Sequence, residues 1–192
     1  MQQINQALTA GYAAFQRGAF DEARRHLEDI DHVKAIHLLG LVEKNAGDTA
    51  AAARLFERAA ELDPQDPEIA NNRAALARQN GDVALAESEF RRALTINPTF
   101  RQASTGLGRL LIDTERWQEA LELYEPLAAA DSGDIVLRYG LATAILNLGR
   151  TEEAADLFDA LIREGNEQAE IRFMRGRARL ELNEVDAALE DL

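Results

Sequence analysis

One stretch of the chain is written several times at an interval of 34 residues, and this repetition constrains the fold more than any other feature. The segment NAGDTAAAARLFERAAELDP, which begins at Asn45, returns as QNGDVALAESEFRRALTINP, which begins at Gln79. Gly, Asp, Ala, Phe and Pro stay in register while most residues between them change. A period of this length is typical of a unit that cannot bury its own apolar face and therefore stacks on copies of itself.

The same positions recur along nearly the whole chain. The recurring small and aromatic residues are Gly47, Gly81 and Gly149, then Ala52, Ala86, Ala120, Ala154 and Ala188, then Phe56, Phe90, Tyr124 and Phe158. Glu115 stands where the intervening Gly is expected. Ala, Leu, Glu and Arg are abundant and only four Pro occur, which favours helix because these side chains lose little rotamer freedom on a helix. The sequence therefore predicts an all-α protein.

Each copy reads as two helices joined by a short turn. Gly47 and Gly81 supply the left-handed conformation that closes the first helix, and Asp48 and Asp82 follow in position to cap the second. The second helix ends before Pro64, because the residue that precedes a proline is driven out of the α region. The recurring Ala and Gly allow the two helices to approach closely, and the aromatic residue fills the space beside that contact.

These residues resemble the tetratricopeptide repeat family, whose pattern is matched by Leu39-Gly40, Ala52, Phe56, Ala59 and Pro64. The resemblance implies a right-handed superhelical solenoid of helix-turn-helix repeats, with five repeats, the first of them shortened, and a truncated sixth. We place the repeats at approximately 4–32, 33–66, 67–100, 101–134, 135–168 and 169–192. We expect residues 1–192 to form a single array that is the N-terminal part of a longer protein.

In this family the first helix of each repeat, helix A, lines the concave side of the superhelix, and the second helix, helix B, forms the outer wall. The resemblance implies a protein–protein interaction scaffold, not an enzyme, that binds a peptide or partner protein in the groove between the A helices. The predicted groove residues are Tyr12, His37, Leu41, Lys44, Asn71, Asn72, Arg78, Thr105, Arg109, Tyr139, Thr143, Phe173 and Arg177. The alternative is a substrate-recruiting domain of a larger bacterial enzyme, namely a sulfotransferase, a glycosyltransferase or an iron-dependent oxygenase.

The charge pattern has two interpretations. The chain has a formal net charge of −13, yet each of the six predicted A helices carries a small net positive charge. A groove of one sign attracts a ligand of the opposite sign, which indicates an acidic peptide. The competing interpretation, which we favour, is that A-helix arginines pair with B-helix carboxylates of neighbouring repeats.

Three further features also have a functional and a structural interpretation. Gly106 and Gly140 leave room either for a ligand backbone or for tight helix packing. The polar residues that end the A helices, including Asn45 and Asn147, either bind a ligand or cap the last carbonyls. The segment IRFMRGRARLEL, which begins at Ile171, places three arginines on one helical face, where they bind an anion or pair with nearby carboxylates. We favour the structural interpretation of each feature.

The remaining composition argues against other functions. The chain has no Cys and three His. His26, His32 and His37 lack a spacing that would bring two imidazoles around a metal, so we predict neither a metal nor a cofactor. The acidic balance disfavours nucleic acid as a partner. The chain has no apolar run of about 18 residues, the length that a membrane span requires. Arg greatly exceeds Lys, which is typical of a bacterial coding sequence. We expect a cytoplasmic protein that can form a homodimer through the uncapped C-terminal end.

Overall fold

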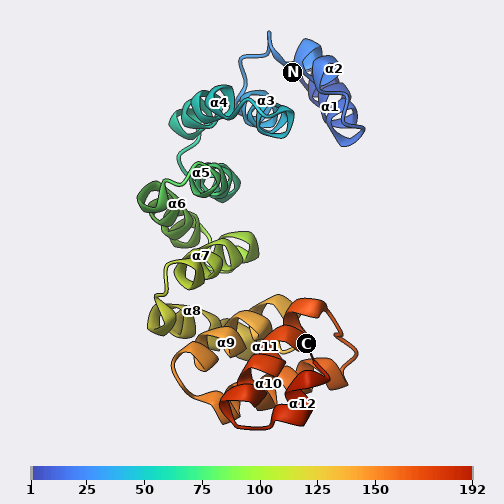
Figure 1. Cartoon of the computed structure of the whole chain (residues 1–192). Coiled ribbons are helices and arrows are strands. Elements are labelled where there is room, and N and C mark those ends of the chain that lie inside the picture. Colours follow the sequence, from blue (N-terminus) through green and yellow to red (C-terminus); the bar gives the residue numbers. More distant parts are fainter. Residues whose placement is uncertain (1, 192) are drawn as a thin grey trace. The chain divides into compact units, whose positions relative to one another are not determined.

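The computed structural model describes residues 2–191, and Met1 and Leu192, the two ends of the predicted array, lie outside that range. All regular secondary structure between residues 2 and 191 is α-helical (Figure 1). The helices are α1 (Gln2–Gln16), α2 (Phe20–Leu27), α3 (Val33–Ala46), α4 (Thr49–Leu62), α5 (Pro67–Gln79), α6 (Val83–Ile96), α7 (Arg101–Asp113), α8 (Trp117–Ala130), α9 (Ile135–Asn147), α10 (Thr151–Arg163), α11 (Ala169–Glu181) and α12 (Val185–Leu189). The predicted all-α fold class is confirmed.

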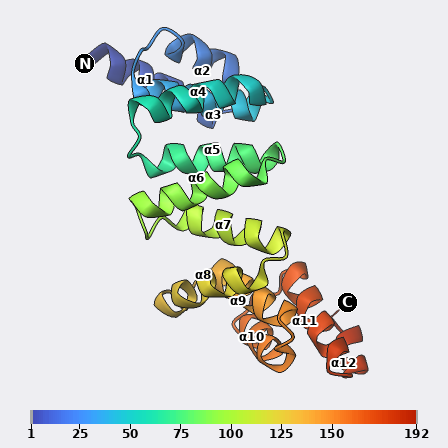
Figure 2. The ribbon, with the colours of Figure 1, turned by 90° about the vertical axis from the view of Figure 1, so that its left-hand side faces the viewer.

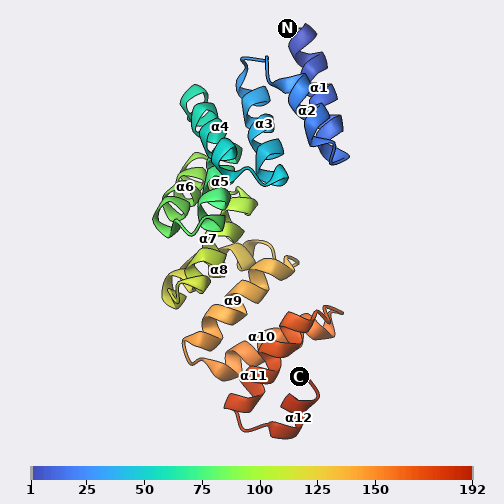
Figure 3. The same ribbon diagram turned by 45° about the horizontal axis from the view of Figure 1, so that its top comes forward.

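The chain divides into two compact bodies. The N-terminal body extends to Gly106 and the C-terminal body begins at Leu107, so the boundary lies within α7. In the N-terminal body, α1 packs on α2, α3 on α4 and α5 on α6, and each hairpin contacts the next through α2 with α3 and α4 with α5 (Figure 2). In the C-terminal body, α9 packs on α10 and α11 on α12, while α8 contacts α9 and α10 contacts α11 (Figure 3).

The turns within the hairpins have the predicted chemistry. Gly47 ends α3 with a φ of 92°, a left-handed conformation that glycine adopts without steric cost. The side chain of Asp48 accepts a hydrogen bond of 2.8 Å from the backbone N–H of Ala51, and Asp82 caps α6 in the same way through Leu85, at 3.0 Å. Both aspartates therefore stabilise the first turn of a B helix.

The first repeat is shortened, as its sequence predicts. Its B helix, α2, has 8 residues, whereas α4 has 14. The helix ends at Leu27, and the chain then turns through Ile30. His32 caps the next helix by accepting a hydrogen bond of 3.2 Å from the N–H of Lys34.

The core is built from contacts between an aromatic residue of helix B and glycines of helix A. Phe56 is fully buried, and a Cβ placed on Gly40 would lie 2.6 Å from its ring. Within the N-terminal body, a Cβ on Gly106 would lie 2.3 Å from the ring of Phe90. Within the C-terminal body, a Cβ on Gly140 would lie 2.4 Å from Tyr124. Tight helix packing, rather than an opening for a ligand backbone, therefore explains Gly106 and Gly140.

Candidate partner-binding surfaces

The A helices of the N-terminal body carry the first group of predicted groove residues. Tyr12 on α1 is 52% exposed, Leu41 and Lys44 on α3 are half-buried, and Asn71 on α5 is half-buried. Arg78, near the end of α5, is exposed. We call these five residues the N-terminal A-helix surface. It combines an aromatic ring, an aliphatic side chain, an amide and two cationic groups.

Two cationic groups of this surface influence each other. The pKa of Lys44 is lowered, mainly by burial and then by the positive charge of Arg78. The two residues occupy equivalent positions, 34 residues apart, on the successive A helices α3 and α5. A carboxylate placed beside Lys44 would favour the charged form of the lysine, because an opposite charge raises the pKa of an amine.

His37 and Asn72 are engaged with each other. His37 is buried, and its Nε2 lies 2.8 Å from Nδ2 of Asn72, which joins α3 to α5. The imidazole also makes an edge contact with the ring of Phe56, at a centroid distance of 5.8 Å. Burial lowers the pKa of His37, and the charges of Asp66 and Glu68 partly oppose this effect. Both side chains are therefore occupied within the protein, and we leave them out of the N-terminal A-helix surface.

The lowered pKa of His37 predicts a loss of stability in acid. Because the folded state holds a less basic imidazole than the unfolded state, its contribution is complete above the unfolded pKa of about 6.5. It decreases as the pH falls below that value, since the unfolded chain then binds a proton more readily. We expect the melting temperature to fall further between pH 7.5 and 5.5 in the wild type than in His37→Gln. Equal shifts in the two proteins would contradict this prediction.

The C-terminal body carries the second group of predicted groove residues. Phe173 on α11 is 57% exposed. Arg177 lies one turn later and donates a hydrogen bond of 2.9 Å to Oδ1 of Asn147 on α9, so this face of α11 is turned toward α9. Tyr139 makes an edge contact with Phe158, and Thr143 is buried, with its hydroxyl bonded to the carbonyl of Tyr139 at 2.8 Å. Phe173, Arg177 and Tyr139 form what we call the C-terminal A-helix surface.

The last two predicted groove residues lie on α7, on either side of the boundary between the bodies. Thr105 belongs to the N-terminal body, and its hydroxyl donates to the carbonyls of Arg101 and Gln102, both at 3.1 Å. Arg109 belongs to the C-terminal body. Its side chain is 70% exposed and lies 3.6 Å from Asp113, a weak surface pair.

The polar residues that end the A helices mainly serve the helices themselves. Asn45 donates a hydrogen bond of 2.8 Å to the carbonyl of Leu41, and Asn147 donates one of 2.8 Å to the carbonyl of Thr143. Each bond runs from the side-chain amide to the backbone carbonyl four residues earlier in the same helix. Both amides are therefore used within the protein, in agreement with the structural interpretation.

The arginine-rich segment of α11 is paired internally, as favoured from the sequence. Arg175 and Arg179 bind Asp159 on α10, at 2.9 and 3.1 Å. Both also bind Asp191, whose side chain is 2% exposed. The sequence predicted pairing with nearby carboxylates but did not identify Asp159, which precedes Arg175 by 16 residues. The same spacing separates Arg73 from Glu89, another observed pair, and could have indicated that such pairs join neighbouring helices.

Pairing between helices accounts for part of the positive charge of the A helices. Arg73 on α5 binds Glu89 on α6 at 2.9 Å, and Arg138 on α9 binds Glu164, which follows α10. These two pairs lie within one repeat, whereas Arg175 and Arg179 pair with Asp159 of the preceding repeat, as the structural interpretation predicts. Lys44 and Arg177 lie on the A-helix surfaces, and Arg177 is also 3.5 Å from Glu181, one turn later.

No helix between residues 2 and 191 is both long enough and apolar enough to cross a bilayer. The same residues contain no group of three or more His, Asp or Glu side chains arranged to hold a metal ion.

Comparisons with known proteins agree on one repeat type. Family models described as tetratricopeptide repeat match residues 6–29, 37–99, 77–134 and 111–172. The chain is 33% identical over 117 residues to the small glutamine-rich tetratricopeptide repeat-containing protein 2 of Mycosarcoma maydis. That match covers 61% of this chain and 33% of the fungal protein, so the chain corresponds to about a third of that relative.

Solved structures share the fold at low sequence identity. The structure of PilF from Pseudomonas aeruginosa has a TM-score of 0.83 at 16% identity, with 99% of this chain and 89% of that chain covered. The structure of YrrB has a TM-score of 0.71 at 18% identity, with 90% and 88% covered. YrrB is described as a TPR protein with an unusual peptide-binding site.

Proposed function

The chain belongs to the tetratricopeptide repeat family, and on this premise we propose that it is a protein-interaction scaffold whose A helices bind an acidic peptide or partner segment. The relatives and the YrrB structure support the general role in protein binding. The choice of an acidic partner comes from this chain's own residues. No catalytic role is assigned to it.

The cationic pair formed by Lys44 and Arg78 is the observation that carries this proposal. A chain with a net charge of −13 has ample carboxylates, yet it keeps a half-buried lysine whose pKa is lowered by burial and by Arg78. A carboxylate of a partner beside Lys44 would favour the charged form of the lysine and would be held by charge-assisted hydrogen bonds, which are stronger than neutral ones.

The N-terminal A-helix surface also carries two apolar side chains that can anchor a ligand. Tyr12 and Leu41 occupy equivalent positions on α1 and α3, one turn before the end of each helix. Aromatic residues that are half exposed on a folded surface are common anchors of binding interfaces. We propose that the ligand of the N-terminal A-helix surface has an apolar side chain close to a carboxylate.

The C-terminal A-helix surface has the same character. Phe173 exposes an aromatic ring one helical turn from the guanidinium of Arg177. The hydrogen bond from Arg177 to Asn147 fixes the direction of that guanidinium and limits the entropy lost when a ligand binds. We propose that this surface takes a second apolar and acidic site of the same partner class.

Charge reversal of the N-terminal A-helix surface tests the proposal. Peptides selected on the wild type from a random library should carry Asp, Glu or a free carboxyl terminus beside apolar residues. We expect Lys44→Glu with Arg78→Glu to weaken their binding by about tenfold or more at low salt, since like charges then oppose each other. Fluorescence anisotropy at increasing salt should show the difference shrink as charges are screened.

A matched control distinguishes the loss of this site from a general effect of net charge on binding. Lys34→Glu with Arg54→Glu changes the net charge by the same amount at exposed positions outside the surface. Its affinity should stay within about twofold of the wild type, because distant surface charges are screened. Equal weakening by both double variants, or none by either, would refute the proposed site.

We also propose that the end of the C-terminal body formed by α11 and α12 associates with a second copy. Leu180 is 44% exposed, whereas the equivalent Leu146 on α9 is 2% exposed. Val185 and Leu189 on α12 are also exposed, and exposed apolar side chains of this kind favour association. Sedimentation of the wild type should show a mass that rises with concentration, and Leu189→Asp should abolish the rise. A constant monomer mass for the wild type would contradict this proposal.

A further inference from the structure

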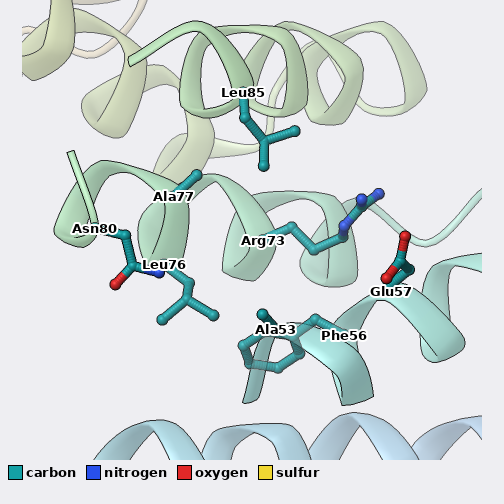
Figure 4. A pocket seen from close by; sticks show the side chains of 8 residues that line it. All are labelled: Ala53, Phe56, Glu57, Arg73, Leu76, Ala77, Asn80 and Leu85. Atoms are coloured by element: carbon teal, nitrogen blue, oxygen red, sulfur yellow. The ribbon is translucent and has the colours of Figure 1, made fainter. Parts of the chain in front are cut away.

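A pocket of about 170 Å³ lies in the N-terminal body between α4, α5 and α6 (Figure 4). Its floor is apolar and buried, formed by Phe56, Leu76 and Ala77. Its rim carries Leu85, Arg73 and Glu57, and Figure 4 shows the two charged side chains together at one end. On α5 the pocket residues lie on a different face from Asn71 and Arg78, so this site is separate from the N-terminal A-helix surface.

The repeat register gives an internal reference for this pocket. Three repeat lengths later, in the C-terminal body, the equivalents of Glu57, Arg73, Ala77, Leu85 and Glu89 are Asp159, Arg175, Arg179, Ala187 and Asp191. The decisive change is Ala77 to Arg179. In the C-terminal body a guanidinium therefore projects from the position that is a methyl group in the N-terminal body.

The contacts of Arg179 show that a guanidinium group fits at this position of a repeat. Its Nη2 donates to Oδ1 of Asp159 at 3.1 Å, and its Nη1 donates to Oδ2 of Asp191 at 2.9 Å. Nη1 also lies 3.3 Å from the carbonyl oxygen of Ala187, the equivalent of Leu85. The guanidinium thus bridges a carboxylate of the preceding B helix and the B helix of its own repeat.

In the N-terminal pocket, the carboxylate equivalent to Asp159 is present, but the arginine equivalent to Arg179 is not. Glu89 is satisfied, because it accepts from Arg73 at 2.9 Å and from Arg92 at 3.3 Å. Glu57, the equivalent of Asp159, is exposed and has no hydrogen-bond or ion-pair partner among residues 2–191. The pocket lies beside this carboxylate, where Ala77 leaves the space that an arginine fills in the C-terminal body.

We propose that this pocket binds an arginine side chain supplied by a partner protein. A cavity of about 150 Å³ holds a benzene molecule, which has more heavy atoms than a guanidinium group. The apolar floor would cover the aliphatic stem of the arginine, and Glu57 would accept from the planar fork of donors, which suits a carboxylate better than the ammonium of lysine does. The strongly acidic chain would attract the basic segment that carries this arginine.

A blocked amino acid tests the pocket directly. In methyl NMR spectra, N-acetyl-arginine amide should cause saturable shifts of Ala77, Leu76 and Leu85. The matched citrulline amide, which has nearly the same shape without the charge, should bind about fivefold more weakly, the size expected for one partly screened ion pair. The lysine amide should also bind more weakly than the arginine amide. No saturable shift at these methyl groups, or equal binding of arginine and citrulline, would overturn the proposal.

Two variants test whether the arginine amide binds in this pocket. Ala77→Arg should fill the pocket from within and abolish the shifts of the Leu76 and Leu85 methyl groups while the helical content stays unchanged. Glu57→Gln should weaken the arginine amide by about fivefold, without weakening the citrulline amide. Retained binding in Ala77→Arg would show that the probe binds elsewhere and would refute this site.

The reverse change gives a test by gain of binding. Arg179→Ala should open the equivalent pocket in the C-terminal body, and the arginine amide should then raise the melting temperature of this variant more than that of the wild type. If Arg179→Ala does not fold, Ala77→Arg alone decides the outcome. Free arginine should bind no more tightly than the blocked amide, because the pocket recognises the side chain; much tighter binding of free arginine would indicate a metabolite site instead and would refute a protein partner.

Discussion

Phe56→Ala is expected to lower the free energy of unfolding of the N-terminal body by about 3–5 kcal/mol, the usual cost of removing a fully buried ring. Phe56 is completely buried, packs over Gly40 and makes an edge contact with His37. These contacts join α3 and α4, so hydrogen exchange of the amides in these two helices gives the most direct measurement. Exchange should accelerate there first, because each repeat is stabilised mainly by its neighbours.

Tyr12→Ala is the matched control for this large loss. Its ring is 52% exposed, and substitutions at such surface positions usually change stability by no more than about 0.5 kcal/mol. The comparison separates burial from aromatic character. A similar loss for both variants, or a loss below about 1 kcal/mol for Phe56→Ala, would contradict the packing described above.

Gly140→Ala is expected to destabilise the C-terminal body by about 1–3 kcal/mol through overpacking. Gly→Ala within a helix usually increases stability, since alanine is more favourable there than glycine by about 1 kcal/mol. Here the added Cβ would lie 2.4 Å from the ring of Tyr124. That ring is only 3% exposed, so it has little freedom to move away. Burial also raises the pKa of its hydroxyl to about 12.

Fluorescence of Trp117, the single tryptophan of the chain, reports urea unfolding of the C-terminal body. Gly133→Ala serves as the control, because its Cβ would meet only Asp131, at 3.6 Å, and we expect almost no change. Tyr124→Leu should relieve the clash, so the double variant should lose less stability than the sum of the single variants. A gain of stability for Gly140→Ala would contradict the predicted contact.

The repeat period predicted the helices because few residues decide where each one begins and ends. Helices α3, α5 and α9 begin at Val33, Pro67 and Ile135, each the first residue of a predicted repeat. Gly47 and Asp48 close one helix and cap the next. These are local effects of backbone conformation and hydrogen bonding, so they can be inferred from neighbouring residues alone.

The depth of the predicted groove residues was harder to infer. The register placed His37 and Thr143 on the inner side of their helices, but both side chains are buried and make hydrogen bonds within the protein. Whether such a side chain reaches solvent depends on the size of residues on the neighbouring helices. Those residues lie about 30 positions away in the sequence, and they vary from one repeat to the next.

The ion pairs show the same limit. Pairing of the arginines in α11 was predicted, but Asp159 was not named as a partner, because it lies on the preceding helix. The pocket beside Glu57 was likewise invisible in the sequence. It becomes apparent only when Ala77 and Arg179 are recognised as equivalent positions with different contacts in the folded chain.

The binding footprint of a library-selected acidic peptide tests the central claim most directly. In backbone NMR spectra of the wild type, the shifted amides should lie on α1, α3 and α5 around Lys44 and Arg78. At the same sub-saturating peptide concentration, the shifts should be much smaller in Lys44→Glu with Arg78→Glu. Shifts confined to α2, α4 and α6, with none near Lys44 or Arg78, would contradict the assignment of partner binding to the A helices.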